Sequence, residues 1–314
     1  MRALVTGGAG FIGSSIVHAL VSAGHDVAII DDLSTGSMDN VHPFALFRRL
    51  DVTGPGLAEV VADFAPDVVM HLAAQVSVAA SLEDPEHDRF VNVEGTRAVA
   101  RAAVAAGARR VLFASTAAVY GEPAELPLTE ESPTVPAVPY GHSKLAAERV
   151  LAETLRPAGI DFACLRLANV YGPRQRAAGE GGVVAEFASR MVGGTERPVI
   201  FGTGRQTRDF IFVADVVNAY YEAADCDGVL AGPGDNGPAY NVSTGQATSV
   251  SMLAEGLRVA LRYTADFVHA DARPGDVEAS LLDPTKARDT FGWMAAVELR
   301  NGLAGTAAWF SQNR

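Results

Sequence analysis

Two kinds of segment alternate along the first half of the chain, and this alternation limits the folds open to it. Short apolar and β-branched runs occupy 2–6, 26–30, 67–72, 109–114 and 160–168. Longer alanine-rich segments with helical spacing occupy 13–24, 56–65, 88–107 and 141–156. Strands that alternate with helices form βαβ units, and continuously apolar strands indicate that helices cover both sheet faces. The sequence therefore predicts an α/β fold with a Rossmann-type, doubly wound parallel sheet.

The pattern changes beyond residue 170. Glycine and proline cluster at 172–182, 202–204 and 231–238. Helical spacing reappears at 183–193, 214–225, 249–262 and 299–314. We expect residues 1–170 to form the Rossmann domain, with 212–247 returning to it. A smaller, interleaved C-terminal lobe is expected to consist of 171–211 and 248–314.

Composition and charge limit the classes of molecule that this protein is expected to bind. The chain has 314 residues, 48% of them hydrophobic, which is enough for a large core. Its net charge of −12 opposes binding to nucleic acid and to anionic membrane surfaces. The two cysteines, Cys164 and Cys226, cannot form a disulfide framework and have no ligand spacing, so we predict no metal site.

The location of the protein is also an expectation from sequence. Met1 and Arg2 lead directly into an apolar strand, without the pattern of a cleaved leader. The apolar runs are too short to span a bilayer. We therefore expect a cytoplasmic protein with no membrane partner.

A glycine-rich turn follows the first strand. It reads Gly7-Gly8-Ala9-Gly10-Phe11-Ile12-Gly13 and leads into a helix, so it matches both GxGxxG and GxxGxxG. Such turns bring backbone close to a pyrophosphate and aim a helix N-terminus at it. The alternative is an ordinary glycine-rich turn. The strand before it and the helix after it favour a dinucleotide site.

Two acids end the next strand. Asp31 and Asp32 stand where a carboxylate binds the adenine ribose hydroxyls, and no arginine occurs from 32 to 47. A 2′-phosphate would meet repulsion there and no cationic partner, so the sequence favours NAD over NADP.

A tyrosine and a lysine lie at the start of the expected helix 141–156, on one of its faces. Tyr140 and Lys144 are four residues apart, and a tyrosine beside an ammonium and a cationic nicotinamide is favoured as a phenolate base. YxxxK alone is common, and a surface tyrosine with a solvated lysine is the alternative. Because this YxxxK motif follows a dinucleotide-type glycine turn in the same chain, it indicates a catalytic pair.

These motifs together resemble those of the extended short-chain dehydrogenases/reductases, in the nucleotide-sugar epimerase and dehydratase group. The resemblance covers nearly the whole chain. It is carried by TGGAGFIG at 6–13, HLAAQ at 71–75, NVEGT at 92–96, STAAVYG at 115–121, Tyr140-xxx-Lys144, NVYGPR at 169–174, RDF at 208–210 and RPGD at 273–276.

The resemblance implies roles for individual residues. It assigns NAD binding to Gly7, Gly10, Phe11, Ile12, Asp31, Asp32, Asp51, Val52, Leu72, Ala73, Ala74, Asn92, Ser115, Tyr140 and Lys144. It assigns catalysis to Thr116, Tyr140 and Lys144. It assigns a UDP-sugar substrate to Gln75, Thr116, Asn169, Arg176, Val183, Val199, Arg208, Arg273 and Asp276. Leu72 and Val183 are equally compatible with core positions, and Arg208 and Arg273 with surface ion pairs.

The residues after Thr116 distinguish the reactions of this group. Relatives that remove water carry an Asp-Glu pair here, and decarboxylating relatives a glutamate at the second position. This chain has Ala117 and Ala118. The remaining set of Thr116, Tyr140 and Lys144 can move one proton and one hydride, which predicts C4 epimerisation of a UDP-hexose. A net nucleotide-sugar dehydrogenase or reductase and a catalytically silent NAD-binding scaffold stay open.

The sugar and the assembly are further expectations. Residues 179–184 resemble the neutral-sugar epimerases, whereas Arg176 could pair with the carboxylate of a UDP-glucuronate, or simply face solvent. Alanine stripes in 88–107 (Ala98, Ala102, Ala105) and 141–156 (Ala146, Ala147) permit close helix packing. With the family resemblance, they predict a homodimer built as a four-helix bundle.

Overall fold

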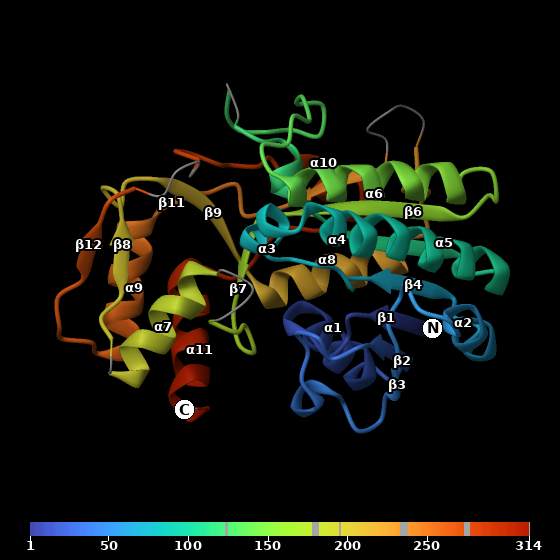
Figure 1. Ribbon diagram of the computed structural model, residues 1–314, viewed down its shortest axis with the longest axis horizontal. Helices are drawn as coiled ribbons and strands as arrows, with labels where there is room; N and C mark the ends of the chain where they lie inside the picture. The colour runs from blue at the N-terminus through green and yellow to red at the C-terminus, as the bar shows by residue number, and fades with distance from the viewer. Residues whose placement is uncertain (123–124, 178–181, 195, 233–237, 273–276, 314) are drawn as a thin grey trace.

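The computed structural model describes residues 1–122, 125–177, 182–194, 196–232, 238–272 and 277–313. Within these residues, a seven-stranded parallel sheet forms the centre of the molecule (Figure 1). Its strands, in spatial order, are β10 (Ala239–Val242), β6 (Asp161–Leu167), β5 (Arg110–Thr116), β4 (Val68–His71), β1 (Arg2–Thr6), β2 (Asp26–Asp31) and β3 (Leu46–Arg49). The order reverses between β1 and β4, as in a dinucleotide-binding fold, so the predicted doubly wound sheet is confirmed.

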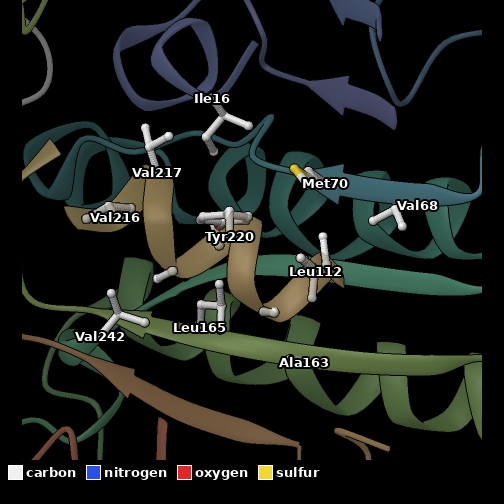
Figure 2. Close-up of a cluster of buried hydrophobic side chains, with 14 of the residues drawn as sticks. Ile16, Val68, Met70, Leu112, Ala163, Leu165, Val216, Val217, Tyr220 and Val242 are labelled. Carbon is white, nitrogen blue, oxygen red and sulfur yellow. The ribbon is translucent and has the colours of Figure 1, made fainter. Parts of the chain in front are cut away.

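Helices cover both faces of this sheet. One face carries α1 (Phe11–Ser22) and α8 (Val213–Asp225). Figure 2 shows how α8 does so: Val216, Val217 and Tyr220 lie against side chains of the sheet. The other face carries α2 (Leu57–Phe64), α5 (Gly95–Ala106) and α6 (Pro139–Leu155). Both faces of each central strand are therefore buried, which explains why the strands are continuously apolar.

A second group of elements packs beyond the carboxyl ends of the central strands (Figure 1). Its helices are α7 (Val183–Gly193), α9 (Val250–Leu261) and α11 (Leu299–Gln312), which share one apolar core. Its strands are β7 (Asn169–Tyr171), β9 (Thr207–Phe212) and β11 (Ala247–Ser249) in one sheet, with β8 (Val199–Phe201) and β12 (Val268–Ala270) in another. Between β9 and β11 the chain leaves this group and forms α8 and β10, which pack on and pair with the large sheet. Later in the chain, α10 (Thr285–Phe291) packs on β10.

The region expected as one helix over 88–107 is divided. It consists of α4 (Pro85–Arg89), a π-helical segment η2 (Phe90–Glu94) and α5, preceded by the short α3 (Val78–Glu83). The side chain of Asp84 caps the start of α4 and Pro85 occupies its first turn. Strand β3 was not expected, because its sequence Leu-Phe-Arg-Arg is half polar and it pairs on one side only. Short 3-10 turns lie at η1 (Met38–Asn40) and η3 (Ala117–Val119).

A buried ion pair fastens α6 to the sheet. The Arg166 guanidinium on β6 donates to both carboxylate oxygens of Glu148 on α6, over 3.0 and 2.8 Å. Ser115 on β5 donates to the same carboxylate, and Arg166 also donates to the Tyr120 hydroxyl. Tyr120 in turn donates to Asn241 on β10. One hydrogen-bonded network thus joins α6 to three strands.

Across the described part of the chain, no helix combines the length and apolarity that a bilayer crossing requires.

Candidate active site

One cavity of about 870 Å³ runs along the carboxyl ends of the central strands and into the second group of elements. In an open parallel sheet this edge is where ligands bind, next to the point at which the strand order reverses. The cavity brings together 19 of the residues singled out from the sequence. They are Gly7, Gly10, Phe11, Ile12, Asp31, Asp32, Asp51, Val52, Leu72, Ala73, Ala74, Ser115, Thr116, Tyr140, Lys144, Asn169, Val183, Val199 and Arg208.

The glycine turn has the close contacts that a dinucleotide site needs. Gly7 has φ +70°, and a Cβ there would lie 2.7 Å from the Ala73 nitrogen. A Cβ on Gly13 would lie 2.1 Å from the Gly7 oxygen, so this glycine permits the helix to pack on the turn. Around Gly10, only the Gly7 oxygen comes within 4 Å, at 3.2 Å. Gly7 and Gly13 are thus required by the fold, whereas the missing side chain at Gly10 leaves space at the cavity.

The start of α1 faces the same space. Gly10 is its N-cap and provides no side-chain hydrogen bond, and Phe11 and Ile12 line the cavity. The first amides of a helix lack intrahelical partners and carry the positive end of its dipole. These residues therefore fit the pyrophosphate of a dinucleotide.

Asp31 is built into the turn that follows β2. Its carboxylate accepts hydrogen bonds from the Ala9 nitrogen (2.9 Å) and the Leu33 nitrogen (2.8 Å). Burial raises its pKa, although these two hydrogen bonds act in the opposite direction. Asp32 is more exposed and accepts from the backbone and hydroxyl of Ser34. Asp51 and Val52 complete this end of the cavity, which suits an adenosine.

Thr116, Tyr140 and Lys144 meet at the other end of the same cavity. Thr116 ends β5, and Tyr140 and Lys144 occupy the first turns of α6. Thr116 and Tyr140 both line the cavity, and the Thr116 side chain acts to lower the pKa of the Tyr140 hydroxyl. The Lys144 ammonium lies 4.4 Å from the centre of the Phe113 ring. The backbone places α6 here by close contact, because a Cβ on Gly141 would lie 2.6 Å from the Ala118 oxygen.

Burial controls the ionisation of this pair. It raises the pKa of Tyr140 to about 12, against the lowering effect of the Thr116 hydrogen bond. It lowers the pKa of Lys144 to about 8, against the carboxylates of Asp88 and Glu148. In the protein without a bound cation, burial therefore favours the phenol form of Tyr140.

Gln75 and Asn92 lie one layer behind the cavity wall. They bind each other through backbone and side chain, with the Gln75 nitrogen 2.8 Å from Asn92 Oδ1. Both also donate to one carboxylate oxygen of Asp88. Asp88 was not singled out from the sequence. Its spacing of four residues before Asn92, on the same helix face, was the available signal.

The second group of elements encloses the far end of the cavity. Asn169, Val183, Val199 and Arg208, which the family resemblance assigns to the substrate, line it. Further lining residues that the sequence reasoning missed include Phe187, Phe201, Gln206, Phe210 and Ser280. The wall is mainly apolar, so it can cover a flat base, while Gln206 and Arg208 supply polar atoms.

Arg176 lies elsewhere. Its guanidinium donates to the Thr35 carbonyl, 2.9 Å away in the loop after β2, and it does not line the cavity. The neighbouring Arg174 reaches His18 on α1, over 3.4 Å. Both side chains cross towards the cofactor half, away from the sugar position expected from sequence. Arg273 and Asp276 lie outside the described residues.

The described residues include no group of side chains that could bind a metal ion. No cluster of three or more histidine, cysteine, aspartate or glutamate side chains suited to a metal ion occurs there. Both cysteines in these ranges are free thiols.

The fold and the tyrosine–lysine pair beside a dinucleotide turn define an extended short-chain dehydrogenase/reductase. The model of the "NAD dependent epimerase/dehydratase family" matches residues 3–242. The chain belongs to that family, and NAD is its cofactor.

Similarity to individual proteins extends over the whole length. The chain is 41% identical to the UDP-glucose 4-epimerase of Mycolicibacterium smegmatis, over 99% of this chain and 98% of that protein. It superposes on a UDP-glucose 4-epimerase of Thermotoga maritima, solved with UDP-glucose, with a TM-score of 0.93, 38% identity and coverage of 100% and 99%. It superposes on a UDP-N-acetylglucosamine 4-epimerase of Methanobrevibacter ruminantium, solved with UDP-N-acetylmuramic acid, with a TM-score of 0.92, 33% identity and coverage of 100% and 99%.

The space at Gly10 yields a prediction about cofactor binding. In Gly10→Ala the new methyl group occupies the space next to the helix N-terminus, so NAD affinity should fall at least roughly tenfold while the fold is kept. Calorimetric titration of cofactor-depleted protein with NAD measures the loss. Gly232→Ala is the control, because a Cβ there meets nothing within 4 Å. Unchanged affinity in Gly10→Ala would remove the glycine turn from the cofactor site.

Proposed function

We propose that this protein catalyses the C4 epimerisation of a UDP-hexose, with UDP-glucose and UDP-galactose as the substrate pair. The observation that carries the proposal is the meeting of Thr116, Tyr140 and Lys144 with the dinucleotide turn in one cavity. Ala117 and Ala118 line the same wall and carry no acid or base. At these two positions the described wall therefore lacks the acid and base that eliminating water or carbon dioxide would use.

Tyr140 is the base in this proposal. As phenolate it takes the proton of the C4 hydroxyl, and as phenol it returns a proton to the 4-keto sugar. NAD, held at the glycine turn and Asp31, would supply reversible hydride acceptance at C4. Lys144 stabilises the phenolate, and Thr116, which lines the same cavity, orients the C4 oxygen.

In this proposal the protein holds the nucleotide in place while the sugar rotates. The apolar wall of Val183, Phe187 and Val199 suits the uracil, and Arg208 suits a diphosphate oxygen. Arg273 and Asp276 remain proposed ligands outside the described residues. Holding the nucleotide and leaving the hexose loosely enclosed allows the keto sugar to rotate between the two hydride transfers.

One experiment distinguishes the proposed epimerase from two other functions. A net dehydrogenase or reductase uses the same residues but consumes cofactor, and a scaffold has no turnover. Purified protein is incubated with UDP-galactose and no added NAD, and the product is followed by NMR. An epimerase reaches the equilibrium mixture over many turnovers, because each cycle regenerates its cofactor. A stop at one turnover would identify a net oxidoreductase, and no turnover with bound NAD a scaffold.

The neutral sugar is favoured by the place of Arg176. Its guanidinium is hydrogen-bonded to the Thr35 carbonyl, on the side of the glycine turn, which supports a neutral sugar over a uronate. UDP-glucuronate stays as the second candidate substrate, to be tested in the same product assay together with the N-acetylated UDP-hexoses.

We further propose a cytoplasmic homodimer that pairs α5 and α6 with their copies. Ala102 and Ala147 are buried in the subunit's own core, whereas Ala98, Ala105 and Ala146 are not fully buried. Phe90, in the segment before α5, is 52% exposed and adds apolar surface next to this helix in the chain. Light scattering at micromolar concentration should give twice the mass of one chain. A monomer at that concentration would count against the four-helix interface.

Removing the base tests the assignment of Tyr140. Tyr140→Phe keeps the ring and loses the proton acceptor, so turnover should fall by roughly 10²- to 10⁴-fold with UDP-sugar affinity largely retained. Steady-state kinetics and substrate titration measure the two effects. Tyr221→Phe, which removes a hydroxyl outside the cavity, should leave turnover unchanged. Near-normal turnover of Tyr140→Phe would be incompatible with the proposal.

Arg176→Ala tests the sugar. Because the side chain bonds to the loop after β2, its loss should change kcat/KM for UDP-glucose and UDP-glucuronate by the same factor, less than roughly tenfold. The exposed Arg300→Ala, far along the chain in α11, serves as the control for a lost surface charge. Selective loss of UDP-glucuronate turnover would reverse the choice of substrate.

A further inference from the structure

The loop that follows β7 connects the second group of elements to the cofactor half (Figure 1). Arg176 Nη1 donates to the Thr35 carbonyl oxygen over 2.9 Å, and Arg174 Nη2 lies 3.4 Å from Nε2 of His18 on α1. The paired residues are 141 and 156 positions apart in the chain. We call the side chains of Arg174 and Arg176 the arginine strap.

The strap connects opposite walls of the cavity. Thr35 lines the cavity on the side of the glycine turn. Gln175, which stands between the two arginines in the chain, lines it on the side of the second group. Neither arginine is itself a lining residue, so their contacts cross the boundary of the cavity rather than its interior.

The backbone of the strap is held in a fixed conformation. Arg174 has a φ of +72°, a left-handed value that a residue with a side chain keeps only where its surroundings enforce it. Gln175 is 5% exposed, and its Nε2 donates to the Val170 carbonyl over 3.1 Å. A Cβ on Gly182 would lie 2.4 Å from the same Nε2, so the start of α7 packs closely on this amide. The loop is thus fixed on its inner side and directs both arginines away from the cavity.

The loop after β2, which accepts the hydrogen bond of Arg176, is fastened to the glycine turn. The Ser37 nitrogen and Asn40 Nδ2 both donate to the Ala9 carbonyl oxygen over 3.0 Å. The Asn40 carbonyl oxygen lies 3.3 Å from His18 Nε2, the nitrogen that Arg174 approaches. Both ends of the strap therefore contact segments that support the dinucleotide turn.

His18 suits a guanidinium neighbour only as a neutral ring. Burial lowers its pKa, and the charge of Arg174 lowers it further, against the raising effect of the Asn40 carbonyl. A neutral imidazole has one nitrogen that accepts a hydrogen bond. Arg174 can therefore donate to His18 without facing a second positive charge.

We propose that Arg174 and Arg176 are positioning residues that hold the second group of elements against the cofactor half and thereby slow the release of NAD. A dinucleotide at the glycine turn and Asp31 occupies the cavity whose two walls the strap connects, so parting of these walls must break the strap. The inference rests on the proposed epimerase function, in which one cofactor serves many turnovers.

Exchange of the cofactor measures the effect directly. Protein loaded with isotope-labelled NAD is mixed with excess unlabelled NAD, and the label that stays with the protein is followed by filtration. Arg174→Ala/Arg176→Ala should release the label roughly tenfold faster than the wild type, because two hydrogen bonds from charged donors are lost. Each single variant should accelerate release by a smaller factor, and the single variants carry the test if the double variant does not fold.

The control removes two arginines from the same group of elements without touching the strap. Arg197→Ala/Arg300→Ala deletes two exposed guanidinium groups that do not line the cavity, and it should leave the release rate unchanged. It therefore separates the contacts of the strap from the loss of positive charge alone.

A double-mutant cycle tests the contact from its other side. His18→Ala removes the group that Arg174 approaches and should also accelerate release. Arg174→Ala should then have little further effect in the His18→Ala protein, since the shared contact is already lost. Thermal unfolding of each variant shows whether the fold is retained.

Turnover provides a second measurement. With UDP-galactose and no added NAD, the diluted strap variant should lose activity faster than the wild type, with the time course of label release. Excess NAD should prevent this additional loss. A purely structural role of the arginines would instead lower activity to the same extent with and without added NAD.

Any of four results would overturn the proposal. They are an unchanged release rate in the strap variants, an equal acceleration in the control, fully additive effects of His18→Ala and Arg174→Ala, and an activity loss that added NAD does not prevent. Because label release requires no turnover, the first three are distinct from failure of the epimerase assay or of Tyr140→Phe.

Discussion

The buried contact between Glu148 and Arg166 determines the position of α6, the helix that carries Tyr140 and Lys144. A two-pronged ion pair inside a protein tolerates little displacement, since each charge is costly once separated from the other. It joins α6 to β6, and through Ser115 it also joins α6 to the end of β5, next to Thr116. The distance between Tyr140, the proposed base on the helix, and Thr116 on the strand is thereby set by a contact that lies behind both side chains.

The cofactor half could be predicted from the sequence, because its chemistry is local. Gly7, Gly10 and Gly13 lie within one turn, and Asp31 follows at the end of the next strand, so spacing alone places them together. The structure adds which glycine serves which purpose. Tyr140 and Lys144 were likewise identifiable, since four residues on a helix bring two side chains to one face.

Other features depended on tertiary contacts that no local pattern encodes. Asp88 reads as one acid in a charged stretch, and only the packing of α4 against α6 buries it. Arg176 reads as a cation beside a substrate motif, but the loop that carries it turns towards Thr35. Strand β3 pairs with β2 along one side and has a half-polar sequence. Its extended conformation therefore depends on the pairing with β2 rather than on its own residue pattern.

The interleaved path of the chain has a consequence for how the protein is made. Strand β10, at the edge of the large sheet, is reached only after the chain has passed through β7, α7, β8 and β9 of the second group. On a ribosome, the first 170 residues would emerge with the outer side of β6 uncovered and with α8 absent from one face. An unpaired edge and an uncovered apolar face are where nascent chains associate wrongly. Completion of the nucleotide-binding layer must therefore wait until residue 242 has left the exit tunnel, which places the decisive folding step late in synthesis.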